Sequence, residues 1–538
     1  MQLPDLNFGD IYEAVAATFP DRTALVYGDI RYTWRQLETF SNRLVRHLNA
    51  AGLRPDSKIA FYLQNSPAYA ILWNACAKGR FVHANVNYRY VEEELYFLLD
   101  NSDAQAVAYD AQFRVQVEQL KPRLPKVLVW LEVSEGEPPS YADSFYRACL
   151  DGDGSALDIR RSGDDLYFMY TGGTTGYPKA VMWPARERIA VIGMSSSATV
   201  DDHINELKRS SEIPVLLSAA PMMHSTGLTS LMSVMTQGGC IVIPPMEKFD
   251  PALCLRSIDE NQVSRLAIVG DAFGVPLLQA LRDHPDAYDL SSVRLISSAG
   301  TIWSAENKAG LLEYFVNATL SDSLGSSEGS RLGGSVTKRG EATGTGRFQL
   351  GPDAKVFRED LTEILAGSEE PGLLATSGPL PLGYYKDPEK TAQTFPVIDG
   401  VRYSMAGDWV KVAADGTMEL LGRGSHCINT GGEKVFPEEV EEALKRIPEI
   451  IDAAVIGLPD ERFGQAVTAL VRTRGNVPVE LGSLRTKLEK QIARYKHPKA
   501  LYVVTDEIRH ENGKMNYRAV KKIAGRIRGD LKVLVDDR

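Results

Sequence analysis

Residues 170–179 read Tyr170-Thr171-Gly172-Gly173-Thr174-Thr175-Gly176-Tyr177-Pro178-Lys179 and are the most informative stretch of the chain. Glycine lets backbone N–H groups converge on a bound anion, and threonine hydroxyls supply further hydrogen-bond donors. Lys179 adds a positive charge, so the stretch suits a polyphosphate. A flexible glycine and threonine turn is the alternative. The stretch is not a Walker A loop, because Tyr177 and Pro178 precede the lysine and Ala180 follows it.

Length, composition and charge bound the class of protein. A chain of 538 residues exceeds one ordinary domain, so at least two are expected. We expect a cytoplasmic protein without a transmembrane segment, because the chain starts without an export signal and has no apolar run that could span a bilayer. The net charge of −10 argues against nucleic acid as a partner but leaves small phosphate-bearing molecules open.

The first 165 residues alternate between strand-like and helix-like patterns. Thr33 and Gln36 form a capping box ahead of an amphipathic helix. This alternation favours the α/β class, with a parallel sheet covered on both faces. The last hundred or so residues are predicted to form a small α+β domain. Its expected helices are 437–445 and 484–495, and its expected strands are 453–456, 466–471 and 501–504.

Three further stretches carry polar groups suited to a site. Asp322-Ser323-Leu324-Gly325-Ser326-Ser327-Glu328 combines hydroxyls with a carboxylate that can hold Mg²⁺, a cation that prefers a few carboxylates plus phosphate oxygens. The alternative is a Ser/Gly loop with one exposed glutamate. His224 follows a proline turn at a predicted helix start, where it is a satisfied polar residue or part of a site. Asp271 either caps the helix through Leu281 or lies in an acyl pocket.

The order of these motifs resembles that of the adenylate-forming enzymes, which include acyl-CoA synthetases, luciferases and the adenylation domains of peptide synthetases. Their phosphate loop runs aromatic-Thr-Ser/Gly-Gly-Thr-Thr-Gly-x-Pro-Lys-Gly, and this chain departs from it only at Ala180. Residues 322–328 resemble the family's aromatic-Gly-x-Thr/Ser-Glu, with Leu324 in place of the aromatic ring. The resemblance covers essentially the whole chain. A narrower likeness is to bacterial acyl-CoA synthetases for long or bulky acids, including steroid side-chain acids.

The resemblance implies a large N-terminal multi-sheet α/β domain, residues 1–423, and a small mobile α+β domain, residues 424–538, hinged near Ser425. Catalysis is assigned to Lys514, Glu328, Thr174 and His224, with Glu328 as the Mg²⁺ ligand. Asp322 is expected to accept the adenine amino group, and Asp408 and Arg423 to contact the ribose. In full, the nucleotide and cosubstrate are assigned to Thr171, Gly172, Gly173, Thr174, Thr175, Gly176, Lys179, Ser298, Ala299, Gly300, Asp322, Ser323, Ser327, Asp408, Arg423, Gly432 and Lys514.

The implied reaction joins a carboxylic acid to CoA with ATP and Mg²⁺, through an acyl adenylate. Pocket walls are expected from Leu228, Leu231 and Met232 and from residues near Phe273. The alternatives are an aryl or a short- or medium-chain acid, and transfer to a carrier protein, which is disfavoured because no carrier domain follows residue 538. Luciferase-like oxidation and a nucleotide-binding protein without turnover are weaker alternatives. A homodimer is compatible with the sequence.

Overall fold

The computed structural model describes most of the chain. The described residues are 3–171, 177–193, 198–301, 303–341, 344, 346–368, 370–423, 428–431, 433–435, 437–476, 479–508, 519–520 and 522–527. The chain divides into two compact units, each with strands and helices. The first contains Met1–Tyr88, Leu98–Thr171 and Lys179–Gly424, and the second contains Arg89–Phe97, Gly172–Pro178 and Ser425–Arg538.

One sheet of the first unit has eight strands in the order β20-β9-β8-β4-β3-β5-β6-β7. Neighbours from β8 to β7 are parallel, and β9 and β20 are added antiparallel. This confirms the parallel sheet predicted from the strand and helix alternation, since parallel neighbours need crossover connections. The strands are β3 Lys58–Tyr62, β4 Val82–Asn85, β5 Ala104–Asp110, β6 Val129–Val133, β7 Asp143–Ser144, β8 Leu166–Thr171, β9 Lys179–Pro184 and β20 Gly383–Tyr384.

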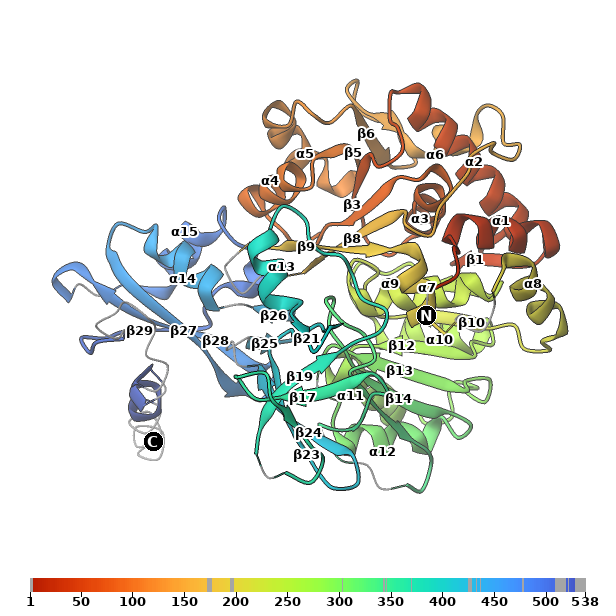
Figure 1. Ribbon diagram of the computed structural model, residues 1–538. Coiled ribbons are helices and arrows are strands. Elements are labelled where there is room, and N and C mark those ends of the chain that lie inside the picture. The colour runs from red at the N-terminus through yellow and green to blue at the C-terminus, as the bar shows by residue number, and fades with distance from the viewer. Residues whose placement is uncertain are drawn as a thin grey trace. The chain divides into compact units, whose positions relative to one another are not determined.

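A second, 14-stranded sheet runs in the order β18-β17-β19-β23-β24-β16-β15-β14-β13-β12-β10-β11-β1-β2. Its strands β14, β13, β12, β10, β11 and β1 are parallel neighbours, and β12, β13 and β14 lie side by side in Figure 1. The strands are β1 Thr23–Tyr27, β2 Ile30–Thr33, β10 Val215–Ser218, β11 Cys240–Ile243, β12 Arg265–Ile268, β13 Leu295–Ala299, β14 Thr319–Leu324, β15 Gly333–Thr337, β16 Arg347–Leu350, β17 Ala354–Phe357, β18 Glu363–Ile364, β19 Gly372–Thr376, β23 Asp408–Val412 and β24 Thr417–Arg423. A small hairpin pairs β21 Val397–Ile398 with β22 Val401–Arg402.

Helices cover both sheets, and their starts follow from the sequence. The capping box is confirmed: Gln36 N donates to Thr33 Oγ1 at 3.2 Å, and Thr33 N donates to Gln36 Oε1 at 2.9 Å. A hydrophobic cluster joins α1, α2, α3 and α9 to the strands beside them. The helices are α1 Phe8–Thr18, α2 Trp34–Ala50, α3 Pro67–Gly79, α4 Glu92–Asn101, α5 Arg114–Leu120, α6 Phe145–Leu150, α7 Ala185–Val191, α8 Val200–Arg209, α9 Ser225–Thr236, α10 Pro251–Glu260, α11 Gly270–Asp283, α12 Ala305–Tyr314 and α13 Pro388–Thr394.

The second unit contains a five-stranded sheet with its own hydrophobic core. The sheet runs β26-β25-β28-β27, and β29 pairs with β28. One predicted helix is too long: α15 ends at Leu488, and the extended backbone of Ala493 separates it from a short 3₁₀ turn at Arg494–Lys496. The elements are β25 Ile428–Thr430, β26 Glu433–Val435, α14 Pro437–Lys445, β27 Ile450–Asp460, β28 Gly464–Thr473, α15 Leu481–Leu488 and β29 Ala500–Val503.

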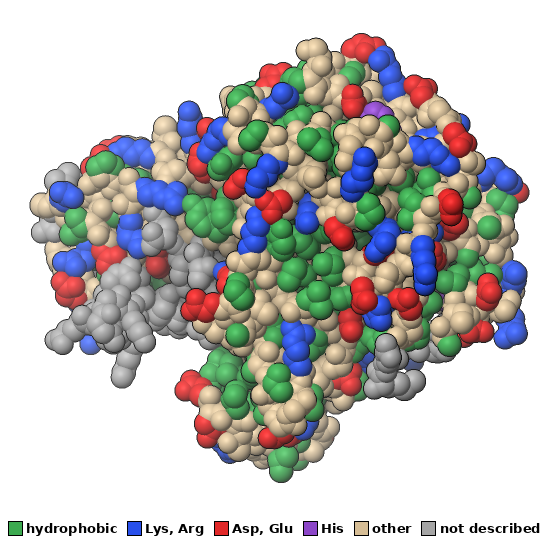
Figure 2. All heavy atoms as spheres, turned by 45° about the horizontal axis from the view of Figure 1, so that its top comes forward, with side chains coloured by type: hydrophobic (Ala, Val, Ile, Leu, Met, Phe, Trp, Pro, Cys, Tyr) green, Lys and Arg blue, Asp and Glu red, His purple; other side chains and the backbone are tan. Residues whose placement is uncertain are grey.

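The surface mixes charges of both signs. Figure 2 shows lysine and arginine side chains interspersed with aspartate and glutamate on the face in view, rather than gathered into a single basic stripe. A basic stripe is the usual footprint of a nucleic-acid interface. Within the part of the chain that the structure describes, no helix combines the length and the apolar character needed to cross a bilayer.

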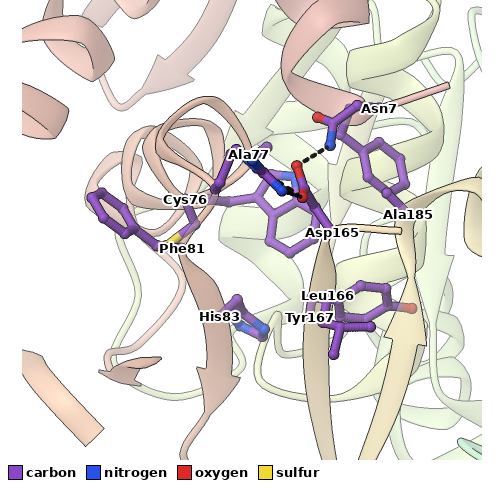
Figure 3. Close-up of a pocket in the computed structure, with 12 residues that line it drawn as sticks. Asn7, Cys76, Ala77, Phe81, His83, Asp165, Leu166, Tyr167 and Ala185 are labelled. Atoms are coloured by element: carbon purple, nitrogen blue, oxygen red, sulfur yellow. Dashed lines mark hydrogen bonds and ion pairs between the residues drawn. The ribbon is translucent and has the colours of Figure 1, made fainter. Parts of the chain in front are cut away.

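His83 is a buried histidine on β4. Its ring packs edge-on against Phe61 and Trp73, with ring centroids 4.4 and 5.3 Å apart, and it lies at the wall of a small cavity (Figure 3). Burial lowers the pKa of His83 to about 3, although the hydrogen bond with the Phe168 carbonyl opposes this shift. His83 is therefore neutral in the folded protein throughout the physiological range.

The buried His83 is expected to make the fold sensitive to acid. Between its ordinary pKa of 6.5 and about 3, the unfolded chain protonates His83 and the folded chain does not. Stability is therefore lost as the pH falls, and His83 should lower the free energy of unfolding by about 1.4 kcal/mol for each pH unit. A His83→Gln variant should show a shallower pH dependence in urea unfolding, and the exposed control His284→Gln should keep the wild-type slope. An unchanged slope in His83→Gln would contradict this prediction.

Candidate active site

Four of the predicted segments lie at the carboxyl ends of neighbouring parallel strands. The His224 turn follows β10, Asp271 follows β12, Gly300 follows β13 and Glu328 follows β14. Parallel strands place their carboxyl ends along the same sheet edge, where open α/β sheets bind their ligands. Because β10, β12, β13 and β14 are consecutive neighbours in the sheet, segments up to about a hundred residues apart come together there.

Ser298, Ala299, Asp322 and Ser323, which are assigned to the nucleotide, lie on the adjacent strands β13 and β14, where successive side chains point to opposite faces of the sheet. Ser298 of β13 is in register with Asp322 of β14, and both are buried; Ala299 is in register with the exposed Ser323. Ser298 Oγ accepts a hydrogen bond from Gly270 N at 2.9 Å. Alternation along a strand therefore prevents all four side chains from facing one ligand.

Asp322 is already engaged in a buried ion pair. Lys308 Nζ lies 2.7 Å from Asp322 Oδ2, and both side chains are almost fully enclosed. Burial raises the pKa of the Asp322 carboxyl above its usual value, and Lys308 partly offsets this shift. If Asp322 also contacts an adenine amino group, as predicted, its carboxylate has to bind Lys308 and the adenine at the same time.

The turn after β13 contains a hydroxyl, that of Thr301, which the sequence did not single out. Gly300 has a positive φ of 94°, a conformation that favours glycine. Beside it, the Thr301 hydroxyl oxygen is buried and has no hydrogen-bond partner among the described residues. A buried hydroxyl without a partner is costly, so Thr301 is a candidate ligand contact.

Glu328 is held in place from the other sheet. The Tyr384 hydroxyl of β20 donates to Glu328 Oε1 at 2.9 Å, and Trp183 Nε1 of β9 donates to the Ser327 carbonyl at 2.8 Å. Glu328 is only 7% exposed. Tyr384 and Trp183 were missed as site residues, because no local pattern shows that β9 and β20 meet the loop after β14.

Lys179 starts β9 and forms an ion pair with Asp387, the residue that caps α13. Partial burial raises the pKa of the Asp387 carboxyl, but the hydrogen bonds from Lys179 and the Lys390 backbone and the charges of both lysines together outweigh it, and the pKa lies below its usual value. The lysine predicted to bind phosphate is therefore paired with a carboxylate here. The adjoining Ala180, which stands at the family's glycine position, is fully buried within β9 and pairs with Tyr170 of β8.

Lys179→Met is expected to raise the KM for ATP by about tenfold, since a charge-assisted hydrogen bond contributes roughly 1.5–3 kcal/mol. Asp387→Asn is the matched control, because asparagine caps a helix as well as aspartate does and releases the lysine. Its KM for ATP should stay the same or fall. Steady-state kinetics with varied ATP test both variants, and a tenfold rise in Asp387→Asn would show that the pair matters only for structure.

The two residues predicted to contact ribose lie opposite each other. Asp408 opens β23 and is paired in the antiparallel register with Arg423 at the end of β24. Asp408 is largely buried. The side chain of Arg423 lies outside the described residues. The pairing brings two positions fifteen residues apart together across neighbouring strands, and their ribose contacts stay predictions.

His224 is the N-cap residue of α9, where its side chain makes no capping hydrogen bond to the helix. Gly227 is required nearby, because a Cβ at this position would lie 2.3 Å from the Pro221 carbonyl oxygen. The predicted pocket walls are wrong in part: Leu228, Leu231 and Met232 are fully buried in the hydrophobic core. The helical period turns these three side chains inward, and the partly exposed Thr229, Ser230 and Ser233 lie on another face of α9.

Asp271 does not cap its own helix, since α11 begins at Gly270 with Val269 as its N-cap. Its Oδ1 instead accepts hydrogen bonds from the backbone N and the hydroxyl of Ser304, both at 3.0 Å, at the start of α12. Leu324, which replaces the family's aromatic residue, packs against the hydrophobic cluster around Phe348. Both residues therefore have structural partners.

Several predicted site residues lie outside the described residues. They are Gly172, Gly173, Thr174, Thr175, Gly176, Ser425, Gly432 and Lys514. Their assigned roles therefore stay predictions. Thr171 and Lys179, which flank the predicted phosphate loop, are described and pair with each other across β8 and β9.

None of the predicted site residues that the structure describes lines the small cavity in Figure 3. It measures about 20 Å³ and is lined by Asn7, Trp73, His83, Asp165 and Tyr167 among others. Asn7 Nδ2 donates to Asp165 Oδ2 at 2.9 Å across it. A volume of this size holds about one water molecule, so the cavity is a packing feature rather than a substrate site.

Comparison with known families identifies the protein family to which this site belongs. A model described as AMP-binding enzyme matches residues 12–385, and one described as AMP-binding enzyme C-terminal domain matches residues 439–514. The chain belongs to the AMP-binding enzyme family. This confirms the resemblance inferred from the motifs.

Two curated relatives match this family member over nearly their whole length. A medium/long-chain-fatty-acid–CoA/3-oxocholest-4-en-26-oate–CoA ligase of Mycobacterium marinum is 39% identical over 96% of both chains. A 3-oxocholest-4-en-26-oate–CoA ligase of Rhodococcus rhodochrous is 37% identical over 97% of this chain and 96% of the relative.

Solved structures of similar fold support the predicted architecture. The amide bond synthetase McbA from Marinactinospora thermotolerans matches with a TM-score of 0.79 at 20% identity, covering 96% of this chain and 99% of that one. The o-succinylbenzoate CoA synthetase MenE of Bacillus subtilis matches with a TM-score of 0.77 at 22% identity, covering 95% and 98%. They confirm the fold class, a large multi-sheet α/β domain followed by a small C-terminal domain.

Proposed function

We propose that this chain is an AMP-forming acyl-CoA ligase that converts a carboxylic acid, ATP and CoA into acyl-CoA, AMP and pyrophosphate. The observation that carries the proposal is the near full-length match to named CoA ligases at 37–39% identity. The described site supports it, because the His224 turn, Gly300 and Glu328 follow neighbouring parallel strands of one sheet. We propose the cytoplasm as its location. We also propose a homodimer as its assembly, and light scattering of the purified chain would test the dimer.

The chemistry follows from the charges of the substrates. A carboxylate acylates poorly because its leaving group is an oxide, and attack on the α-phosphorus of ATP replaces that oxide with AMP. Two anions must approach each other, so the site needs cations and hydrogen-bond donors that act where charge develops. Lys179 and Lys514 are the proposed cations, and Thr174 and Ser327 the proposed donors. CoA then attacks the acyl carbonyl through its thiol, and AMP leaves.

The residues present fit a Mg²⁺ ion held mainly by phosphate. Glu328 offers a single buried carboxylate with Oε1 fixed by Tyr384, and the described residues form no cluster of three or more metal-ligating side chains. Mg²⁺ is commonly bound by one or two carboxylates together with substrate phosphates and water. Glu328 would hold the ion, which would supply positive charge to the phosphate groups.

The proposed acid is long-chain, bulky or a steroid side-chain carboxylate. This choice follows the names of the two relatives above. A panel of acids in a CoA-consumption assay tests it, with a medium-chain, a long-chain, an aryl and a steroid side-chain acid in parallel. Highest kcat/KM for the long-chain or steroid acid supports the proposal, and preference for the aryl acid contradicts it. Faster turnover with a carrier-protein thiol than with CoA would favour the carrier alternative.

A further inference from the structure

Asn85, the last residue of β4, uses its whole side-chain amide to bind two separate backbone segments. Tyr170 N donates to Asn85 Oδ1 at 2.6 Å, and Asn85 Nδ2 donates to the Tyr170 carbonyl at 3.1 Å. The same Nδ2 donates to the Met223 carbonyl at 2.7 Å. Asn85 is only 3% exposed, so these bonds are shielded from bulk solvent. The three partners also fix which end of the amide carries oxygen, because a flipped amide would face donor with donor.

The first segment is the end of β8. The ladder between β4 and β8 contains one registered pair, Ala84 with Phe168, and β4 ends at the next residue. The Asn85 side chain extends the ladder by bonding both backbone groups of Tyr170. Thr171 follows and completes β8, and the phosphate-loop sequence comes directly after it.

The second segment is the turn Pro221–His224, which leads into α9. Tyr69 Oη donates to the Met222 carbonyl at 2.9 Å, and Met222 N donates to Asn65 Oδ1 at 2.7 Å. Asn65 Nδ2 in turn donates to the Ala220 carbonyl at 3.2 Å. Side chains from β4, the β3–α3 loop and α3 therefore hold residues 220, 222 and 223, immediately before His224.

We propose that Asn85 is a positioning residue for the ligase reaction, which fixes the end of β8 and the His224 turn relative to each other. The inference rests on the proposed function. Only asparagine supplies one acceptor and two donors at this reach: aspartate lacks the donors, and glutamine is longer by a methylene. The amide thereby ties the strand that precedes the phosphate loop to the turn that presents the predicted catalytic histidine.

The test is steady-state adenylation, followed by pyrophosphate release at varied ATP and acid, for Asn85→Asp and Asn85→Ala, with thermal unfolding measured on the same samples. Asn85→Asp keeps the acceptor and loses both donors. Asn74→Ala is the matched control, because Asn74 is equally buried and bonds Ser41 at 3.0 Å between α2 and α3. The expected result is a 10- to 100-fold lower kcat for both Asn85 variants, as roughly expected for misplaced reactants, with KM values changed less than about threefold. Asn74→Ala should lose stability but keep kcat within about twofold.

Unchanged kcat in the Asn85 variants, or an equal loss in Asn74→Ala, overturns the proposal. If the Asn85 variants fail to fold, Tyr69→Phe decides, since it preserves the ring and removes only the hydroxyl, which bonds the Met222 carbonyl at 2.9 Å and lies 3.1 Å from His83 Nε2. A several-fold loss of kcat with unchanged KM in Tyr69→Phe supports the positioning role, and wild-type kcat overturns it. The wild-type protein separates the ligase hypothesis from the positioning hypothesis. If the wild type forms no adenylate with any acid, the proposed function fails. If the wild type is active and the variants are unaffected, only the role of Asn85 is contradicted.

Discussion

Replacing Lys514 by alanine is expected to lower the rate of acyl-adenylate formation by about 10²–10³-fold. The resemblance places this ammonium group between the carboxylate and the phosphate, where negative charge concentrates as the two anions meet. The second half-reaction does not bring two anions together. Preformed acyl adenylate plus CoA should therefore still give thioester at close to the wild-type rate.

The measurement is to assay the two half-reactions separately, by pyrophosphate release and by thioester formation from synthetic adenylate. Lys522→Ala is the matched control, since Lys522 is exposed in the same C-terminal region. It should leave both half-reactions unchanged. Equal loss of both half-reactions in Lys514→Ala would mean that the lysine supports the fold rather than adenylation.

Glu328→Gln is expected to lower the rate of adenylation by about 10²-fold and to raise the Mg²⁺ concentration needed for half-maximal rate. Glutamine keeps the shape of the side chain and removes the charge that would hold the cation. Its amide can still accept the hydrogen bond from Tyr384, which lies at 2.9 Å in the wild type. Glu328→Gln therefore tests the loss of the carboxylate charge without a loss of the side chain's position.

Two further variants make this experiment specific. Tyr384→Phe removes only the hydroxyl that orients Glu328, so we expect a loss of about tenfold or less in rate with an unchanged Mg²⁺ requirement. Glu313→Gln, on an exposed position of α12, should have no effect. A Glu328→Gln enzyme with the wild-type Mg²⁺ dependence would exclude Glu328 as the metal-binding carboxylate.

The family and the fold class could be predicted from the sequence because short-range chemistry specifies both. The phosphate loop, the stretch ending at Glu328 and the Thr33 capping box each depend on residue types at fixed spacing, and such spacing is visible in one dimension. The capping box is present, and the family assignment and the α/β architecture are confirmed. The roles of Lys514 and the phosphate loop stay predictions of the same kind.

Only the tertiary structure showed which side chains are available to a ligand and which are already engaged. Asp322 and Lys179 both match their motifs, but both are already in ion pairs. Asp322 is paired with Lys308, and Lys179 is paired with Asp387. Leu228 looked like a pocket wall from its place after His224, but the packing of α9 against the core buries it. Asn85 carried no motif at all. These partners lie 14 to more than 200 positions apart in the chain, and their contacts depend on how strands and helices pack, which local residue patterns do not encode.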